Sequence, residues 1–144
     1  MILFFNFGLR MQYWLVKSEP FKYSWDNLVA DGKTFWDGVR NFQARNYLKS
    51  MKVGDKVLFY HSNEGLCVVG VAKVAKEHYP DPTDTEGKWV CIDLEPDFAL
   101  NKPVSLAQIK QDPLLANIPL LKQARLSVMP VTKEEFEQIV KMGQ

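Results

Sequence analysis

The chain has 144 residues, of which 47% are hydrophobic and 24% are charged. This profile is typical of one compact globular domain with enough apolar side chains for a proper core, and it argues against a second full domain. The net charge of +1 excludes neither nucleic acid nor any other partner. Residues 1–80 hold eleven basic and seven acidic side chains, whereas residues 81–144 hold seven and ten. This asymmetry weakly favours a basic face on the N-terminal half, and a mixed solvated surface explains it equally well.

The cysteines and the N-terminal residues indicate in which cellular compartment the protein is expected. Cys67 and Cys91 stand in apolar runs without CxxC spacing or a nearby His, so we expect buried reduced thiols, no disulfide and no zinc site. Residues 1–10 are apolar, but they lack a basic start and a cleavage signal and are too short to span a bilayer. Met11 is the expected natural start, which leaves residues 1–10 as an extension to a single domain at 11–144. We expect a cytoplasmic protein, nuclear if eukaryotic, with no membrane association.

The N-terminal third predicts a strand followed by a short helix. Residues 12–16 are typical of a strand, and Pro20 must end any regular ladder. Ser24 is a capping residue for a helix of about two turns, which Gly32 stops. The side chains of this helix that face inward are expected to be Trp25, Leu28 and Val29.

A second helix is predicted at residues 42–51, because apolar residues recur there at spacings of three, four and seven. Its core face is expected to comprise Ala44, Tyr47, Leu48 and Met51. The opposite face carries Phe42, Arg45, Asn46 and Lys49.

Three further strands are predicted in the middle of the chain. Residues 53–61 give a turn at Gly54 and Asp55 and then a strand rich in β-branched and aromatic residues. Residues 65–79 form a longer strand, in which Gly70 indicates a bend or a close backbone approach. Residues 89–94 alternate as a third long strand.

The last third predicts two capped helices and a short closing strand. Helices begin after Ser105 and Thr132, and Glu135 completes a capping box in the second of these. Residues 125–131 are typical of a strand that ends at Pro130. Helices before and after a run of sequential strands predict an α+β domain around a mostly antiparallel, curled sheet.

Four stretches bring polar side chains next to aromatic ones, and three of them stand where a strand ends or a helix begins. They are WLVKSEP at 14–20, WDGVRNFQARN at 36–46, FYHS at 59–62 and RLSV at 125–128. Scaffolds usually present a site at such positions. Arg40, Asn41 and Gln43 fall at the start of the second helix, where free backbone N–H groups attract anionic or carbonyl oxygens. This corner suits a planar ligand with many acceptors.

In this order, from residue 12 to residue 142, these stretches together with GVAKV and YPDPT resemble the EVE domain family. The strings WDGVRN and KSEP are the specific ones. The resemblance implies a PUA-like pseudobarrel, related to the YTH readers, that binds a modified base in DNA or RNA without transforming it. The base expected is of the 5-substituted cytosine type, flipped into an aromatic and polar pocket. No cofactor and no metal are expected, and the domain is expected to be a monomer.

Reading one modified base requires that the base leave its stack, so the protein needs aromatic walls and groups that bind the Watson–Crick edge. Stacking on such a wall is worth about 1–3 kcal/mol. We expect these groups to converge on one hollow. The candidate residues are Lys17, Ser18, Glu19, Pro20, Trp25, Trp36, Arg40, Asn41, Gln43, Arg45, Lys49, Tyr60, His61, Ser62, Arg125 and Ser127.

The candidates divide by role. The expected pocket walls are Trp25, Trp36 and Tyr60. Directional hydrogen bonds are expected from Ser18, Arg40, Asn41 and Gln43, and contacts to the nucleic-acid backbone from Lys17, Arg45 and Lys49.

Several candidates also have purely structural explanations. Trp36 is a natural core residue, and Lys17 with Glu19 makes an ordinary surface pair. Asn41 is equally a helix cap, and Arg45 packs over Phe42. Strand-end hydrogen bonds account for Arg125 and Ser127, and turn formation accounts for Asp81 and Asp84.

Two other functions stay open. The first is an enzyme acting on a modified nucleoside or base, with His61, Glu19 or Asp37 moving protons. Against it, adjacent His61 and Ser62 on a strand point to opposite faces, and no metal-ligand cluster is evident. The second is a small-ligand or protein-interaction module on the same fold, for which a near-neutral total charge is expected.

Overall fold

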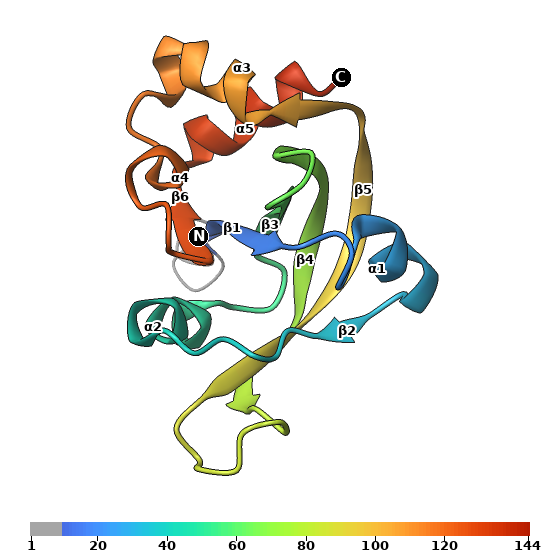
Figure 1. Ribbon diagram of the computed structural model, residues 1–144, viewed down its shortest axis with the longest axis vertical. Coiled ribbons are helices and arrows are strands. Elements are labelled where there is room, and N and C mark those ends of the chain that lie inside the picture. Colours follow the sequence, from blue (N-terminus) through green and yellow to red (C-terminus); the bar gives the residue numbers. More distant parts are fainter. Residues whose placement is uncertain (1–9) are drawn as a thin grey trace, which may run out of the picture.

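The computed structural model describes residues 10–144 (Figure 1). The expected extension at 1–10 therefore lies outside the described residues, apart from Arg10. The strands are β1 (Tyr13–Ser18), β2 (Thr34–Phe35), β3 (Lys56–His61), β4 (Cys67–Pro80), β5 (Val90–Ser105) and β6 (Val128–Val131). The helices are α1 (Trp25–Asp31), α2 (Phe42–Ser50), α3 (Leu106–Gln111), α4 (Pro119–Lys122) and α5 (Lys133–Met142), with a 3₁₀ turn η2 (Pro113–Leu115).

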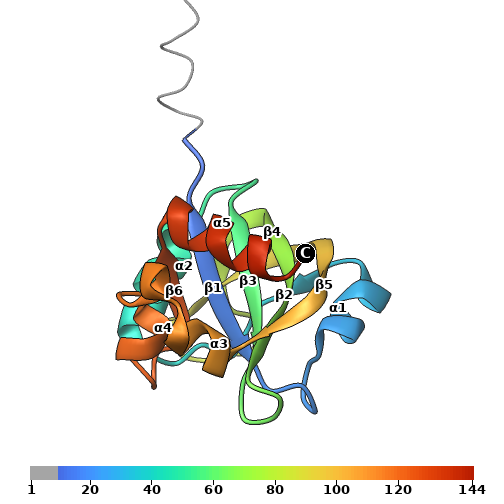
Figure 2. The same ribbon diagram turned by 90° about the horizontal axis from the view of Figure 1, so that it is seen from above.

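The strands form one curled sheet in the order β2-β5-β4-β3-β1-β6. Strands β1 and β3 are parallel, and the other neighbouring pairs are antiparallel. Strands β4 and β5 are long, and their register shifts several times, which bends the sheet into an open barrel. In Figure 2 the helices α3, α4 and α5 lie on one side of the barrel and α1 on the other. The expected α+β class and PUA-like pseudobarrel are confirmed.

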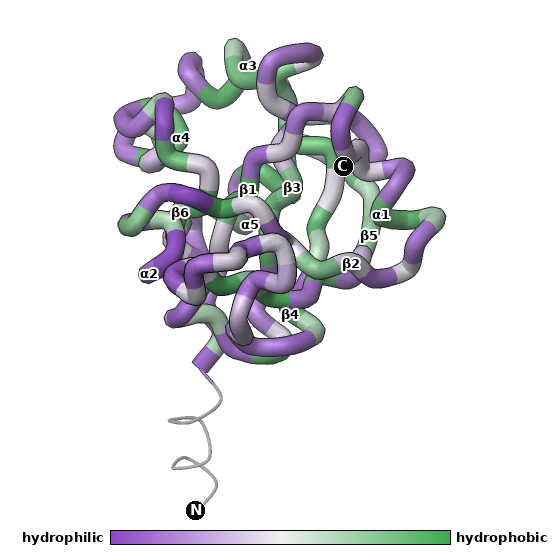
Figure 3. Tube along the Cα trace, turned by 60° about the horizontal axis from the view of Figure 1, so that its bottom comes forward, coloured by the Kyte–Doolittle hydropathy of each residue, from purple (hydrophilic) through white to green (hydrophobic). Residues whose placement is uncertain are grey.

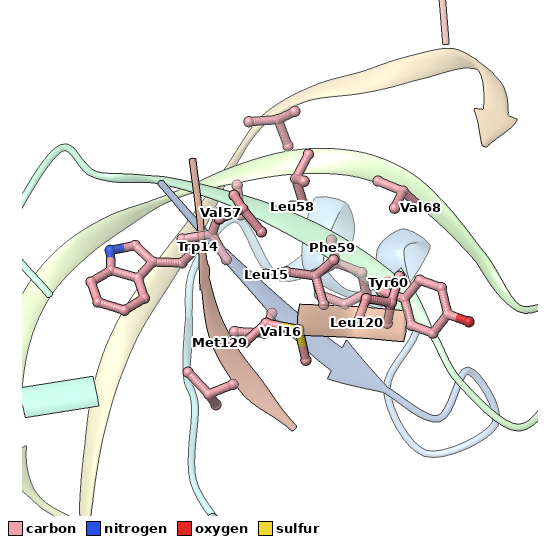
Figure 4. Close-up of a cluster of buried hydrophobic side chains, with 14 of the residues drawn as sticks. Trp14, Leu15, Val16, Val57, Leu58, Phe59, Tyr60, Val68, Leu120 and Met129 are labelled. Carbon is pink, nitrogen blue, oxygen red and sulfur yellow. The ribbon is translucent and has the colours of Figure 1, made fainter. Parts of the chain in front are cut away.

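The core fills the inside of this curled sheet. Phe59, Leu15 and Met129 are fully buried and come from β3, β1 and β6 (Figure 4). In Figure 3 hydrophobic segments occupy the interior, while the connecting segments at the periphery are largely hydrophilic. Burial of the apolar sides of these strands favours the curled form of the sheet. Within the described part of the chain, no helix has the length and apolar character that crossing a lipid bilayer requires.

The helix starts that the sequence predicts are confirmed. Ser24, Ser105 and Thr132 each accept a hydrogen bond from a backbone N–H in the first turn of α1, α3 and α5, and each forms a capping box. Gly32 ends α1 in the left-handed conformation, at a φ of 75°. Local signals suffice here because both partners of each cap lie within three residues.

Three predictions about single residues are wrong. Val29 does not face inward but is 53% exposed, because the sheet contacts only the Trp25 and Leu28 side of the short helix α1. Pro130 does not end a strand but pairs with Trp14 inside β6, which an edge strand tolerates. Cys67 is only half-buried at the start of β4; it and Cys91 are both free thiols.

Strands β5 and β6 depart from the predicted bounds, and β2 has no counterpart in the prediction. Strand β6 begins at Val128 instead of at residue 125. Strand β5 continues from Val90 to Ser105 instead of stopping near residue 94. It passes through Pro96 because the register with β4 shifts next to that residue, so the missing N–H interrupts no regular ladder. Strand β2 has two residues, Thr34 and Phe35, which is too short for a periodic pattern to reveal.

Candidate functional site

A cleft of about 450 Å³ opens between the end of β1 and the segment that links β2 to α2. Its walls are residues 17–19 and 22–23 on one side, residues 34–40 on the other, and Ser127 before β6. We call it the Trp36 cleft. Its volume falls in the range of roughly 300–1,000 Å³ that small-molecule sites occupy.

Trp36 is the largest aromatic side chain that lines the cleft. Its ring makes T-shaped contacts with Phe59, at 5.5 Å between centroids, and with Tyr23, at 6.2 Å. Its backbone N–H donates to the carbonyl of Ile92 at 2.7 Å, which attaches this segment to β5. The indole N–H makes no hydrogen bond within residues 10–144 and is not buried, so it is available to a ligand. Trp36 is thus both anchored to the core and half-exposed at the cleft.

The segment from Trp36 to Arg40 is held from a distance by Asp81. One carboxylate oxygen of Asp81 accepts the Gly38 N–H at 2.8 Å and the Arg40 guanidinium at 3.0 Å. Gly38 has a φ of 79°, which favours glycine at this position. Burial acts to raise the pKa of the Asp81 carboxyl, but hydrogen bonds from Thr83, Gly38 and Arg40 outweigh it and lower the pKa to about 2.

Charged groups at the cleft are unevenly paired. Lys22 forms an ion pair with Glu19 at 3.5 Å, so the pair of Lys17 with Glu19 that the sequence allowed does not form. Lys17 donates instead to the carbonyl of Ala124 at 2.9 Å, and burial lowers the pKa of its ammonium group. Asp37 is exposed and makes no hydrogen bond or ion pair with other residues in the described range.

The turn after β1 is fixed by its own hydrogen bonds. Ser18 donates its hydroxyl to the carbonyl of Tyr23, and the N–H groups of Lys22 and Tyr23 donate to the carbonyl of Glu19. The Tyr23 hydroxyl donates to Asp31 at 2.8 Å. This wall is therefore preorganised. The Ser18 hydroxyl donates to a backbone carbonyl, an arrangement that does not activate it as a nucleophile.

The predicted single hollow is divided. Tyr60, Ser62, Arg125 and Ser127 line a second hollow of about 420 Å³, which shares Lys17, Glu19 and Ser127 with the Trp36 cleft. Asn41 and Gln43 lie with Arg125 along a third. The expected convergence therefore holds for Lys17, Ser18, Glu19, Trp36, Arg40 and Ser127. It is wrong for the candidates that line only the other hollows, which are Asn41, Gln43, Tyr60, Ser62 and Arg125.

Trp25 is a core residue and lines neither the Trp36 cleft nor the Tyr60 hollow. It is 6% exposed, and its ring lies against Phe59 and directly over Gly70, where a Cβ would come within 2.6 Å of it. The prediction of Trp25 as a pocket wall is wrong for this reason. The prediction of a close approach at Gly70 is confirmed.

His61 acts as part of a helix cap. Its Nε2 accepts the N–H of Trp25, the first residue of α1, at 3.1 Å. Burial lowers the pKa of the imidazole, and the nearby Asp26 carboxylate opposes this. Ser62 lines the Tyr60 hollow instead. The two residues do not act as a pair, as the alternation along a strand predicts.

The remaining candidates on α2 have structural partners. Asn41 caps the helix, because its side-chain oxygen accepts the Ala44 N–H at 2.9 Å. Gln43 donates to the Tyr47 hydroxyl at 3.3 Å. The Arg45 guanidinium lies 5.0 Å from the centre of the Phe42 ring, as its structural explanation predicts. Neither Lys49 nor Pro20 lines the Trp36 cleft.

The structure adds cleft residues that the candidate list lacks. They are Lys22, Tyr23, Thr34, Phe35, Asp37, Gly38 and Val39. Asp37, Gly38 and Val39 lie within the stretch 36–46, and the other four lie within three residues of the stretches 14–20 and 36–46. Taking every residue of each stretch, together with its near neighbours, is a signal that would have found them. A cluster of His, Cys, Asp or Glu side chains suited to a metal ion does not occur in residues 10–144.

A six-stranded curled sheet with a cleft beside the KSEP and WDGVRN strings defines an EVE domain with a PUA-like fold. The EVE domain family model matches residues 12–142, and the chain belongs to this family. Human thymocyte nuclear protein 1 is 35% identical over 92% of this chain and 74% of its own.

Solved structures of other family members are also similar. A protein from Rhodopseudomonas palustris, solved by NMR, is 50% identical with a TM-score of 0.88, over 92% of this chain and 93% of its own. Human THYN1 protein, in a crystal structure with DNA containing 5-methylcytosine, is 34% identical with a TM-score of 0.85, over 92% of this chain and 98% of its own.

Proposed function

We propose that this protein binds DNA that carries 5-methylcytosine and holds the modified base, extruded from the strand, in the Trp36 cleft. The observation that carries the proposal is the half-exposed Trp36 ring, anchored on the core and facing a cleft of about 450 Å³. The human relative solved with DNA containing 5-methylcytosine supports the choice of ligand. An aromatic wall compensates an extruded base for the stacking it loses.

Groups that suit cytosine stand beside this ring. The Asp37 carboxylate is an acceptor without a partner in the described residues, which suits the exocyclic amino group of cytosine. Phe35 and Val39 offer apolar surface for a methyl group. Lys17 and Lys22 carry positive charge at the same wall, where flanking phosphates would lie. Stacking, edge recognition and charge are thus combined in one place.

We further propose that binding occurs without chemistry on the base. His61 accepts a backbone N–H of α1 and does not line the cleft. The Ser18 hydroxyl donates to a backbone carbonyl. Neither group is arranged as a nucleophile or as its base. A reader needs only the complementary surface that the cleft offers.

Equilibrium binding of four short DNA oligonucleotides tests the proposal. They are identical except for cytosine, 5-methylcytosine, thymine or uracil at one central position. Comparing cytosine with 5-methylcytosine isolates the methyl group. Comparing thymine with 5-methylcytosine isolates the Watson–Crick edge, where the amino group at position 4 becomes a carbonyl, which a carboxylate repels, and N3 gains a hydrogen. We expect 5-methylcytosine to bind tightest. Asp37→Asn should reduce the preference over thymine and leave the preference over cytosine.

Trp36→Phe is the companion variant, because it keeps an aromatic side chain in the core contact with Phe59. We expect it to weaken binding of every oligonucleotide and to leave the free energy of unfolding nearly unchanged. Equal affinity of the wild-type protein for all four oligonucleotides would overturn the proposal, as would full affinity in Trp36→Phe.

A further inference from the structure

Outside the cleft, Phe42 and Trp89 form a partly exposed aromatic stack. Their ring centroids lie 4.9 Å apart and the planes are inclined by 32°. Phe42, the first residue of α2, is 58% exposed, and Trp89 is half-buried where the loop after β4 enters β5. Folding therefore leaves Phe42 partly exposed to water beside Trp89.

Arg45 brings a positive charge to this stack. Its guanidinium carbon lies 5.0 Å from the Phe42 ring centre and 5.9 Å from that of Trp89. One terminal nitrogen donates to the carbonyl of Lys88 at 3.1 Å, but the buried Nε has no hydrogen-bond partner among residues 10–144. The Asp84 carboxylate of the same loop accepts the N–H groups of Lys88 and Trp89.

No ion pair to Arg45 is present in the part of the chain that the structure describes. A guanidinium that is partly buried and lacks a counter-charge is well suited to an incoming anion. Guanidinium groups also bind phosphate and stack on aromatic faces, and the second terminal nitrogen of Arg45 makes no hydrogen bond within residues 10–144. The chemistry of the stack therefore matches a base and its phosphate.

Arg40 connects the stack to the Trp36 cleft. It lines the cleft, and its guanidinium carbon lies 5.8 Å from the Trp89 ring centre. Because Arg40 is already paired with the buried Asp81, it acts as a fixed bridge between the two surfaces. Arg40 therefore borders both the cleft and the stack.

We propose that Phe42, Trp89 and Arg45, which we call the Phe42 platform, bind the nucleotide next to the one in the cleft. The neighbouring base stacks on Phe42, and its phosphate pairs with Arg45. This inference rests on the proposed function and adds to it a second nucleotide-binding position. Because every base has a flat face, the platform contributes affinity without sequence preference.

A competing explanation is that the same contacts only fasten the loop after β4 to α2. The two explanations predict different effects when the Phe42 ring is removed, one on DNA affinity and the other on the free energy of unfolding. If the platform binds a nucleotide, Phe42→Ala lowers affinity; if it only fastens the loop, Phe42→Ala lowers stability. Phe42→Leu keeps apolar bulk against Trp89 and removes only the aromatic face, so it separates the two effects.

The test uses the full chain and single-stranded DNA carrying one 5-methylcytosine. Two further oligonucleotides each carry one abasic site that keeps its phosphate. In one of them the abasic site is the 5′ neighbour of the modified nucleotide, and in the other it is the 3′ neighbour. Free 5-methyl-2′-deoxycytidine serves as a ligand for the cleft alone. The matched controls are Phe98→Ala, a 42% exposed Phe on β5, and Lys110→Gln, an exposed cation at the end of α3.

We expect Phe42→Ala and Phe42→Leu to weaken the intact oligonucleotide about tenfold. The wild-type protein should bind one of the two abasic oligonucleotides about tenfold more weakly than the intact one. The two Phe42 variants should bind that abasic oligonucleotide as well as they bind the intact one. Arg45→Gln should reduce the salt dependence by about one phosphate contact. Affinity for the free nucleoside should stay at the wild-type level in every variant, and the controls should behave as the wild type.

Oligonucleotide affinity that is unchanged in both Phe42 variants would overturn the platform and leave the proposed function standing. Equal affinity of the wild-type protein for the intact and for both abasic oligonucleotides would also overturn the platform and leave the proposed function standing. If the wild-type protein binds neither the nucleoside nor the oligonucleotides, the proposed function is overturned, and the platform with it.

Discussion

Arg40 and Asp81 are 41 residues apart in sequence and meet at 3.0 Å, with the Asp81 side chain fully buried. Asp81 belongs to the turn after β4 and also accepts the Gly38 N–H. This turn therefore holds the segment that forms one wall of the Trp36 cleft. The cleft wall thus depends on a residue that lies outside it.

Asp81→Asn should therefore destabilise the cleft wall. It removes the charge that pairs with Arg40 and leaves groups in a buried site imperfectly bonded, which costs about 1–3 kcal/mol. We expect a lower free energy of unfolding in urea, faster hydrogen exchange of the Gly38 amide, and weaker binding of 5-methylcytosine DNA. Asp84→Asn is the control, because Asp84 accepts N–H groups of its own loop only. Equal Gly38 exchange in the two variants would contradict the role assigned to Asp81.

Asn41 is expected to matter for stability and not for base recognition. Its side-chain oxygen caps α2, so Asn41→Ala should lower the free energy of unfolding by about 1 kcal/mol. Asn41→Asp keeps the acceptor and should retain most of that stability. Neither variant should change the ratio of affinities for 5-methylcytosine and cytosine, which a competition titration measures. A changed ratio in Asn41→Ala would return Asn41 to the ligand site.

Gly70→Ala should be destabilising because of Trp25. The added Cβ would lie 2.6 Å from the indole ring, and overpacking of this kind costs about 1–3 kcal/mol. Denaturant unfolding of Gly70→Ala, Trp25→Phe and the double variant measures the coupling between the two positions. The smaller Phe ring should make the Gly70→Ala penalty smaller. Additive effects would show that the penalty arises elsewhere.

The hydrogen bond from the Trp25 N–H to His61 should make α1 sensitive to acid. Burial lowers the pKa of His61 in the folded protein, so the unfolded state binds the proton more readily below pH of about 6.5. The stabilisation is present above that pH and is lost as pH falls through the folded pKa. Hydrogen exchange of the Trp25 amide, corrected for intrinsic rates, should accelerate over this range. In His61→Ala the amide should exchange faster at neutral pH and lack this acceleration.

Short-range features of the fold could be predicted from the sequence. Ser24, Thr132 and Asn41 lie within three residues of the N–H groups that they cap, so their roles depend on local spacing alone. Gly70 also stood out, because an isolated glycine in a long strand indicates a close approach. The family resemblance added the order in which the stretches occur.

The composition of the cleft could not be predicted in the same way, because it depends on contacts between distant residues. No pattern in the sequence predicts that Lys17 and Ser127 line two hollows, of which one contains Trp36 and the other Tyr60. Nor did it show that Trp25 would cover Gly70 in the core, or that Asp81 would bond the Arg40 guanidinium. All three depend on how segments far apart in the sequence meet in the folded chain.

The most direct test of the central claim is backbone and indole ¹H–¹⁵N chemical-shift mapping during titration with an oligonucleotide that carries 5-methylcytosine. We predict the largest changes at the Trp36 indole N–H and at the amides of Ser18, Asp37 and Gly38, and smaller changes with the unmodified oligonucleotide. Changes centred instead on the hollow between Tyr13 and Glu134, or the same changes with both oligonucleotides, would contradict the account.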